Sequence, residues 1–231
     1  MKRVKIFPMK TARGKVEEIF LDGSARISCP PGLIPTPGQF LQAQADGSSS
    51  PLPVSLFPSL SSPNGFRSAP PIPSEWTPGK SLTLRGPIGR GFSLPPSARK
   101  TALISFDDSL SRLLGLVSQA LAQKSEIVAV CDTVVEGLPE IVEIQPLRSL
   151  PDVLAWADYA AMDMERGKLN RLEKNLEALG QAAARIEAQV LLRSPMPCAG
   201  IADCGVCAFT SRRGWRMICR EGPVFDLGDV I

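Results

Sequence analysis

The first hundred residues alternate between apolar and polar side chains over short runs, a pattern typical of half-buried β-strands. Strand character is clearest in residues 15–21 and 40–45, and it returns in the short run 82–85. Proline and serine are dense in residues 48–78, which favours long loops or edge strands there because proline cannot donate a backbone hydrogen bond to a sheet. The pattern predicts a small antiparallel β-barrel over residues 1–97.

Further along the chain the pattern changes to strands that alternate with helices. Continuous apolar runs predict three buried strands, at residues 101–106, 127–131 and 141–144. Between the first two, apolar residues recur at helical spacing, which predicts a helix that begins at Asp108 or Ser109 and buries Leu110, Leu113, Leu114, Val117 and Leu121. Alternation of this kind predicts a parallel α/β sheet over residues 98–192.

A leucine-rich stretch, residues 163–180, predicts a second amphipathic helix. Its apolar face consists of Leu169, Leu172, Leu176 and Leu179, and charged residues lie opposite. Gly180 is placed as its C-cap, since glycine adopts the left-handed conformation that ends many helices. Residues 185–192 are then predicted to form a last strand that leads into a cysteine-rich segment.

Histidine is absent from all 231 residues, and this narrows the chemistry more than any other feature of the composition. Its absence excludes mechanisms that need a serine–histidine or cysteine–histidine pair, and metal sites with histidine ligands such as Rieske clusters. It also removes the usual general base near neutral pH. Electron transfer is one of the few chemistries that needs no histidine.

Charge and hydropathy predict a globular protein without a polyanion-binding surface. The formal net charge is only +3, and no basic stripe is interleaved with aromatic residues, so a nucleic-acid partner is not expected. No apolar run is long enough for a signal peptide or a membrane span. We therefore expect a cytoplasmic protein, in which thiols stay reduced and clustered cysteines indicate metal binding or catalysis.

Four of the six cysteines lie within 22 residues and carry the strongest chemical signal in the chain. Their spacing is C-x5-C-x2-C-x11-C, formed by Cys198, Cys204, Cys207 and Cys219. The plant-type [2Fe–2S] pattern is C-x4-C-x2-C with a distant fourth cysteine, which differs by one residue in the first gap. Small residues between the cysteines let backbone amides approach the sulfurs. We predict a [2Fe–2S] cluster-binding segment over residues 193–231.

Other interpretations of these cysteines stay open. Four cysteines also satisfy tetrahedral zinc, although zinc ribbons usually bring two C-x2-C pairs and this chain has one. A [4Fe–4S] cluster usually has more closely spaced ligands, and disulfides are disfavoured in a reducing compartment. The other two cysteines, Cys29 and Cys131, are distant in sequence, and Cys131 ends an apolar run as a core thiol would.

Arginines surround the last cysteine, at Arg212, Arg213, Arg216 and Arg220. Their positive charge would ease reduction of an anionic cluster or dock an acidic partner. A solvated basic loop that keeps the chain soluble explains them equally well.

Residues 197–207 and 213–225 resemble the electron-transfer subunit of heterotetrameric dihydroorotate dehydrogenase, within the wider ferredoxin-reductase-like group. Residues 37–40 resemble the strand entry of that group's flavin-binding barrel, and residues 86–92 resemble its closing Gly-Pro-Leu-Gly-x-Gly-Phe element. The resemblance spans nearly the whole chain and is most specific at the C-terminus. It implies a β-barrel domain that holds FAD, an α/β domain that takes NADH, and a cluster that passes electrons to a partner's flavin.

The sequence departs from this family at the flavin motif. The family's Arg-Pro-x-Ser aligns with residues 52–55, which places Pro53 and Ser55 at the FAD site but Leu52 where an arginine would pair with phosphate. Residues 66–76 replace the phosphate-binding turn that follows, and only Arg67 offers a substitute cation there. The resemblance therefore implies FAD, while this motif disfavours it.

The nicotinamide motifs depart further. Residues 106–112 replace a glycine-rich turn, and the aspartates Asp107 and Asp108 would repel pyrophosphate from the helix N-terminus that they occupy. Residues 156–161 replace the family's Cys-Gly-Pro element. We predict that the chain does not bind NAD.

Together these patterns predict a β-barrel plus α/β fold, a ferredoxin-reductase-like two-domain architecture with a C-terminal [2Fe–2S] loop. The predicted role is a non-catalytic electron-transfer subunit. Its expected partner is a flavoprotein dehydrogenase or another redox enzyme in a heteromeric complex. Two alternatives stay open, a complete FAD-dependent NADH reductase subunit and a structural zinc-binding subunit.

Overall fold

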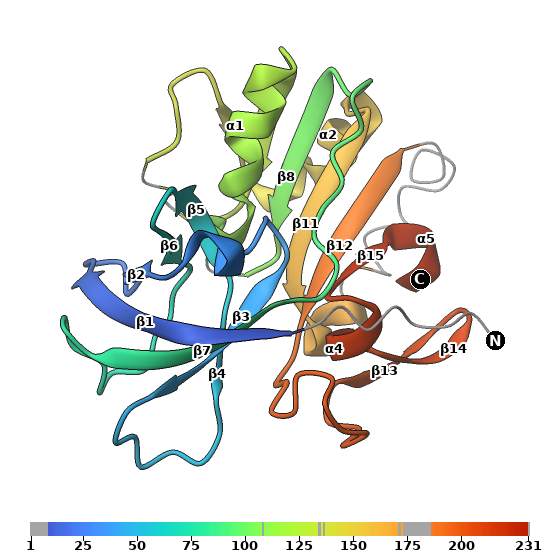
Figure 1. The fold of residues 1–231 in the computed structure, drawn as a ribbon. Helices are drawn as coiled ribbons and strands as arrows, with labels where there is room; N and C mark the ends of the chain where they lie inside the picture. The colour runs from blue at the N-terminus through green and yellow to red at the C-terminus, as the bar shows by residue number, and fades with distance from the viewer. Residues whose placement is uncertain are drawn as a thin grey trace.

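The computed structural model describes residues 9–107, 109–133, 135, 137–170, 172 and 186–230. An antiparallel sheet from the first ninety residues curves into a barrel-like domain, and a mostly parallel sheet follows it (Figure 1). The C-terminal elements, orange to red in Figure 1, lie beside the edge of the second sheet. The predicted β-barrel plus α/β fold is confirmed.

The barrel-like sheet has seven antiparallel strands, β1 Lys10–Ile19, β2 Ala25–Ser28, β3 Phe40–Ala45, β4 Val54–Leu56, β5 Pro58–Ser62, β6 Gly65–Ser68 and β7 Ser81–Ile88. Their order across the sheet is β4-β3-β7-β1-β2-β6-β5. The strands predicted at residues 15–21, 40–45 and 82–85 correspond to β1, β3 and β7.

Alternation of side chains builds the core of this sheet. Every second residue of β7 is buried, so Leu82 and Leu84 face inward while their neighbours face outward. They pack in one cluster with Ile27, Leu41 and Phe66 from three other strands. The edge strands β4 and β5 both come from the proline- and serine-rich stretch, as expected from the cost of proline in a central strand.

The second sheet has six strands, β8 Lys100–Ser105, β9 Glu126–Val130, β10 Glu143–Gln145, β11 Tyr159–Glu165, β12 Glu187–Arg193 and β15 Val224–Asp226. Their order is β10-β9-β8-β11-β12-β15, and the first five are parallel. From β8 the next two strands in sequence, β9 and β10, are added on one side. The later strands β11 and β12 are added on the other side. The strand order therefore reverses between β8 and β11, and ligands of parallel α/β sheets bind in the crevice at such a switch point.

Two helices cover opposite faces of this sheet, α1 Gly115–Ala122 and α2 Leu150–Trp156. Leu103 of β8 belongs to the cluster on the α1 side, whereas its neighbours Ala102 and Ile104 belong to the cluster on the α2 side. Among the described residues, no helix is both long enough and apolar enough to cross a lipid bilayer.

The helix predicted from Asp108 or Ser109 begins later, at Gly115. Ser109 instead precedes a turn of 3-10 helix, Ser111–Leu113, and its Oγ accepts the backbone N–H of Ser111 at 3.1 Å. Asp108 lies outside the described residues. Three of the five apolar positions predicted for this helix, Leu110, Leu113 and Val117, are buried, whereas Leu114 and Leu121 are half-buried.

The helix predicted over residues 163–180 is wrong at its start, because residues 159–165 form β11. All but the last residue of β11 are buried, as in a central parallel strand, and Asp163 is among them. Two arginines neutralise its carboxylate inside the protein. The prediction failed here because a charged residue is normally expected on the solvent-exposed face of a helix. Residues 171 and 173–185 lie outside the described residues, and so do the predicted positions Leu176, Leu179 and Gly180.

After β12 the chain leaves the sheet edge, and it returns there as β15. In between it forms the hairpin of β13 Ala208–Ser211 and β14 Gly214–Met217 and the short helix α4 Ile218–Glu221; α5 Leu227–Val230 follows β15. β15 pairs antiparallel with β12, with Val224 opposite Leu191. The cysteine-rich segment is therefore an excursion that is held at both ends. The predicted domain boundaries at residues 97 and 192 stay a prediction.

Candidate metal centre

The cysteine-rich excursion brings its four thiols together from separate local structures. Cys198 and Cys204 lie in the loop after β12, Cys207 directly precedes β13, and Cys219 lies in the turn of α4. The β13–β14 hairpin pairs Ala208 with Met217 and so brings the chain near Cys207 alongside the chain near Cys219. The backbone N–H of Ile218 closes this end of the hairpin by donating to the Cys207 carbonyl at 3.2 Å.

The thiols approach one another as two pairs. The Sγ atoms of Cys204 and Cys198 are 3.3 Å apart, and those of Cys207 and Cys219 are 3.2 Å apart. The pairs are neighbours, because Cys198 also interacts electrostatically with Cys219. The structure therefore gathers all four cysteines that the sequence singled out.

The two pairs differ in burial. In one pair Cys198 is half-buried and Cys204 is exposed, so we call them the outer pair. In the inner pair Cys207 is 1% exposed and Cys219 is 5% exposed. A group bound by both pairs would thus reach from the protein interior to the solvent.

Backbone amides surround the outer pair. Ala199 and Gly200 have positive φ angles of 44° and 83°, and Gly205 has 72°, so the loop curls around the sulfurs. Burial acts to raise the pKa of Cys198, but backbone hydrogen bonds at Ala202 and Gly200, together with bonds from Cys204, lower it to about 7. The loop thus stabilises a thiolate, the form of cysteine that binds metal.

The inner pair has the opposite electrostatics while no metal is bound. Burial raises the pKa of the Cys219 thiol, and the neighbouring Cys207 raises it further. Two thiolates side by side in a buried site repel each other, so the protein needs a cation there for both to ionise. The donor set fits a positively charged metal.

The four sulfurs approach one another as two pairs. Within the described part of the chain, no group of three or more cysteine, aspartate or glutamate side chains is arranged to hold one metal ion. Tetrahedral zinc takes four donors around a single point and stays an alternative for these cysteines. A [2Fe–2S] cluster needs two thiolates at each iron, which matches two adjacent pairs.

The arginines near the last cysteine are mostly neutralised. Arg213 and Arg216 both pair with Asp229, at 2.9 and 3.2 Å, and Arg220 pairs with Asp203. Carboxylates therefore offset most of the positive charge that the sequence suggested for this loop. Arg212 is exposed, which agrees with the interpretation as a solvated basic loop.

Two other arginines contact the cysteine loop from outside it. Neither belongs to a motif that the sequence analysis identified. Arg85 of β7 donates from Nη2 to the Cys198 carbonyl at 3.3 Å. Arg166, directly after β11, donates from Nη1 to the carbonyls of Val206 and Ala208, both at 2.7 Å. One comes from each domain. Only the folded structure brings them to the loop, because they are about 110 and 40 residues away from it in sequence.

The motifs that suggested the family resemblance meet at one junction. Gly89 packs against the chain at Gly222 and Pro223, where an added Cβ would lie 2.3 Å from the proline ring. Arg90 donates its backbone N–H to the Gly222 carbonyl at 2.6 Å, and an added Cβ on Gly38 would lie 2.5 Å from Val224. These glycines allow the barrel to contact the C-terminal strand closely. The junction therefore fixes the cysteine excursion against the barrel.

The predicted flavin residues line a cavity of about 720 Å³ between the two domains. Pro53 and Ser55 contribute its barrel side, and Ser55 Oγ accepts a hydrogen bond from Gln42 at 2.9 Å. Pro197 and Val206, the chain neighbours of Cys198 and Cys207, also line it. A ring bound there would lie beside the cysteine loop.

The same cavity lacks the arginine and the phosphate turn of the family's flavin motif, although Arg112, Arg166 and Arg193 also line it. Leu52 is 57% exposed and offers no charge where an arginine would be expected. Pro70 and Pro71 line the cavity where a phosphate turn would be needed, and proline has no N–H to donate. The N–H of the preceding Ala69 is already bound to the Phe57 carbonyl at 2.8 Å. The predicted substitute Arg67 is bound to Asp22 instead, at 2.9 Å.

The switch-point crevice of the second sheet is filled by side chains of this chain. Asp163 is fully buried and accepts from Arg193 Nε at 2.7 Å and from Arg112 Nη1 at 3.3 Å. Asp107, after β8, forms ion pairs with Arg193 and Lys168. The cations at this position are already paired with the two carboxylates, and the described residues after β8 offer no glycine-rich turn for a nucleotide phosphate. The residues present therefore do not fit a nicotinamide dinucleotide.

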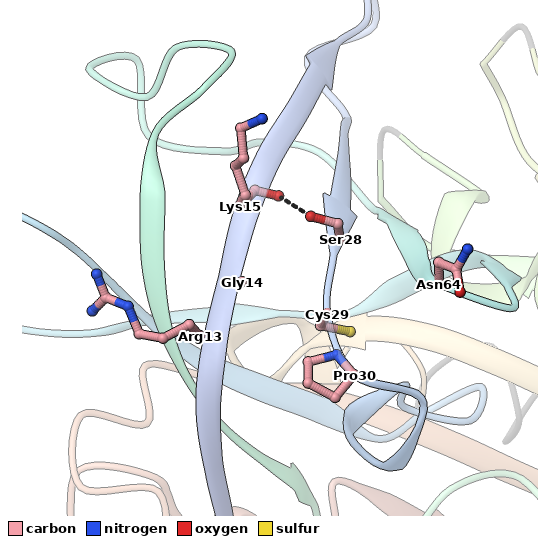
Figure 2. A pocket seen from close by; sticks show the side chains of 7 residues that line it. All are labelled: Arg13, Gly14, Lys15, Ser28, Cys29, Pro30 and Asn64. Carbon is pink, nitrogen blue, oxygen red and sulfur yellow. Dashed lines mark hydrogen bonds between the residues drawn. The ribbon is translucent and has the colours of Figure 1, made fainter.

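A second, shallower hollow of about 370 Å³ lies on the outside of the barrel and contains Cys29 (Figure 2). Arg13 and Lys15 extend away from one another there, and Arg13 is already paired with Asp46. Burial raises the pKa of Cys29 to about 11, so its thiol stays protonated near neutral pH. Cys131 is 4% exposed and agrees with the predicted core thiol.

Solved structures of ferredoxin reductases have a similar fold. A chain of the NADH-dependent reduced ferredoxin–NADP oxidoreductase, studied for flavin-based electron bifurcation, has a TM-score of 0.76 at 14% identity and covers 95% of this chain and 90% of its own. The ferredoxin reductase in carbazole 1,9a-dioxygenase has a TM-score of 0.62 at 14% identity, covering 80% and 70%. Ferredoxin-NADP+ reductase from Plasmodium falciparum has a TM-score of 0.57 at 9% identity, covering 78% and 96%.

No protein-family model and no curated protein sequence matches the chain. The structural likeness at such low identity shows the fold alone. The chain therefore has the ferredoxin-reductase-like fold, with a curved antiparallel domain, a parallel α/β domain and four clustered cysteines near its C-terminus.

Proposed function

We propose that this protein is an iron–sulfur electron-transfer subunit that holds a [2Fe–2S] cluster on Cys198, Cys204, Cys207 and Cys219. The observation that carries the proposal is the approach of these cysteines as two pairs, 3.3 and 3.2 Å between sulfurs. When bound, such a cluster takes up and releases one electron at a time. The chain itself supplies the thiolates, the backbone amides of the outer loop and a buried inner pair that excludes solvent.

The proposed partner is a flavoprotein dehydrogenase or another redox enzyme in a heteromeric complex, as for the electron-transfer subunit of dihydroorotate dehydrogenase. Exposure of Cys204 supports this role, because an electron has to pass between the cluster and a partner at the surface. The filled switch-point crevice supports a subunit that does not oxidise NADH. Electrons would then enter and leave through partners alone.

The first test is the metal content of protein purified without air. We expect visible charge-transfer absorption, an EPR signal on reduction, and about two iron and two sulfide per chain. Full occupancy by zinc without sulfide would contradict the proposal and favour the structural zinc subunit. A colourless protein without metal after anaerobic reconstitution with iron and sulfide would contradict both.

A flavin-containing reductase subunit is the second candidate, and the cavity at Pro53 and Ser55 is the observation that favours it. Because Leu52 replaces the motif's arginine and prolines replace its phosphate turn, we expect protein denatured after gentle purification to release no FAD. Fluorescence of the supernatant measures this directly. Stoichiometric FAD, together with reduction of the purified protein by NADH, would replace our proposal with this candidate.

A further inference from the structure

We propose that Arg85 and Arg166 are positioning residues that hold the cysteine loop between the two domains and raise the reduction potential of its centre. This inference rests on the proposed function, since it concerns the cluster that the four cysteines would bind.

Arg85 approaches the outer pair from the barrel. Its guanidinium donates to the carbonyl of Cys198, and the charge of that cysteine acts on the guanidinium. The Arg85 side chain is half-buried, so this cation lies partly out of water. Moving a charged guanidinium partly out of water costs free energy, and an adjacent anion offsets this cost.

Arg166 approaches the inner pair from the α/β domain. Its Nη1 donates to the carbonyls of Val206 and Ala208, the residues on either side of Cys207, both at 2.7 Å. Two short bonds from one guanidinium nitrogen fix the backbone through this cysteine. The two arginines thus hold the loop at one cysteine of each pair.

The charges of these two arginines are not offset by carboxylates. Across the residues that the structure describes, neither Arg85 nor Arg166 has an aspartate or glutamate within ion-pair distance, and both bind carbonyls instead. The arginines inside the loop differ, because Arg213, Arg216 and Arg220 each pair with a carboxylate. The positive potential at the cysteines therefore comes mainly from outside the loop.

Uptake of one electron adds one negative charge at the cysteines and forms or breaks no bond. A nearby unpaired cation stabilises that added charge more than it stabilises the oxidised form, so it raises the reduction potential. Since one cation belongs to each domain, the potential also depends on both domains keeping their contact with the loop. A partner that separates them would lower it.

The test is a mediated potentiometric titration of the full-length holoprotein, followed by EPR. Glutamine at either position keeps a donor for the carbonyl and removes the charge, whereas lysine keeps the charge. For Arg85→Gln and Arg166→Gln we expect the ratio of reduced to oxidised cluster, at one fixed potential, to fall about tenfold, which is 59 mV for one electron. Arg85→Lys and Arg166→Lys should stay within about threefold of wild type, since they keep the charge.

Arg26→Gln is the matched control. Arg26 lies on β2 and pairs with Glu18 on the barrel surface, far in sequence from the cysteine loop, so the ratio of reduced to oxidised cluster in this variant should equal that of wild type. Equal shifts in the glutamine and lysine variants, loss of the cluster from both, or no shift in either would overturn this inference. A wild-type protein without any iron–sulfur signal would instead overturn the proposed function itself.

Discussion

Cys207→Ser is expected to abolish the iron–sulfur absorption while the rest of the molecule stays folded. Cys207 is 1% exposed, and its sulfur is 3.2 Å from that of Cys219, so water cannot easily replace the lost ligand. A serine hydroxyl is also a poor ligand near neutral pH, because it stays protonated. We expect the purified variant to lose nearly all of the bound iron, measured by visible absorption and iron analysis.

The matched control is Cys29→Ser, a cysteine of the barrel that is 8% exposed and lies outside the loop. It should keep its iron and its visible spectrum. Far-UV circular dichroism of both variants should match wild type, because the barrel strands pair without the cysteine loop. Retention of the full spectrum by Cys207→Ser would remove this cysteine from the ligand set. Unfolding of the whole chain would show that the metal supports the entire fold.

Asp163→Asn is expected to cause the largest loss of stability among single polar substitutions in the α/β domain. Its carboxylate is fully buried and neutralises Arg112 and Arg193, whose side chains are 9% and 14% exposed. Removal of this carboxylate leaves Arg112 without an ion-pair partner among the described residues, which costs about 3–5 kcal/mol, whereas Arg193 keeps Asp107. Urea denaturation followed by circular dichroism should show this decrease in the free energy of unfolding.

Asp46→Asn provides the comparison, because Asp46 also pairs with an arginine but its side chain is 49% exposed. An exposed pair contributes about 1 kcal/mol or less, so this variant should unfold near the wild-type midpoint. Similar small losses for both substitutions would mean that the network around Asp163 is not a stabilising unit. The stability of the filled crevice would then need another source.

The sequence predicted the fold where the side-chain pattern and the structural environment agree. β3 corresponds to the predicted strand at residues 40–45, and β8 and β9 each lie within one residue of their predictions, because buried apolar runs specify them directly. The four C-terminal cysteines were also found by spacing alone. In both cases the signal is local, so no knowledge of distant residues is needed.

The remainder could not be predicted because it depends on contacts between distant segments. From sequence alone Asp163 is expected at the surface, because its ion pairs with Arg112 and Arg193 depend on the fold. For this reason the sequence did not predict β11. Arg85 and Arg166 carry no local signal, since they bind backbone carbonyls, which every residue has. The pairing of Cys207 with Cys219 likewise follows from the β13–β14 hairpin and not from their spacing.

The return of the chain at β15 has a consequence for how the centre is assembled. Residues 194–223 leave and re-enter the sheet at neighbouring strands, with Leu191 opposite Val224. Their two ends are therefore already held about 5 Å apart before any iron arrives. Assembly of the centre therefore does not require a free chain end to be ordered. It requires only that residues within an already closed loop become ordered. Because both of its ends lie together, the loop could be inserted between two adjacent antiparallel strands at the edge of another sheet.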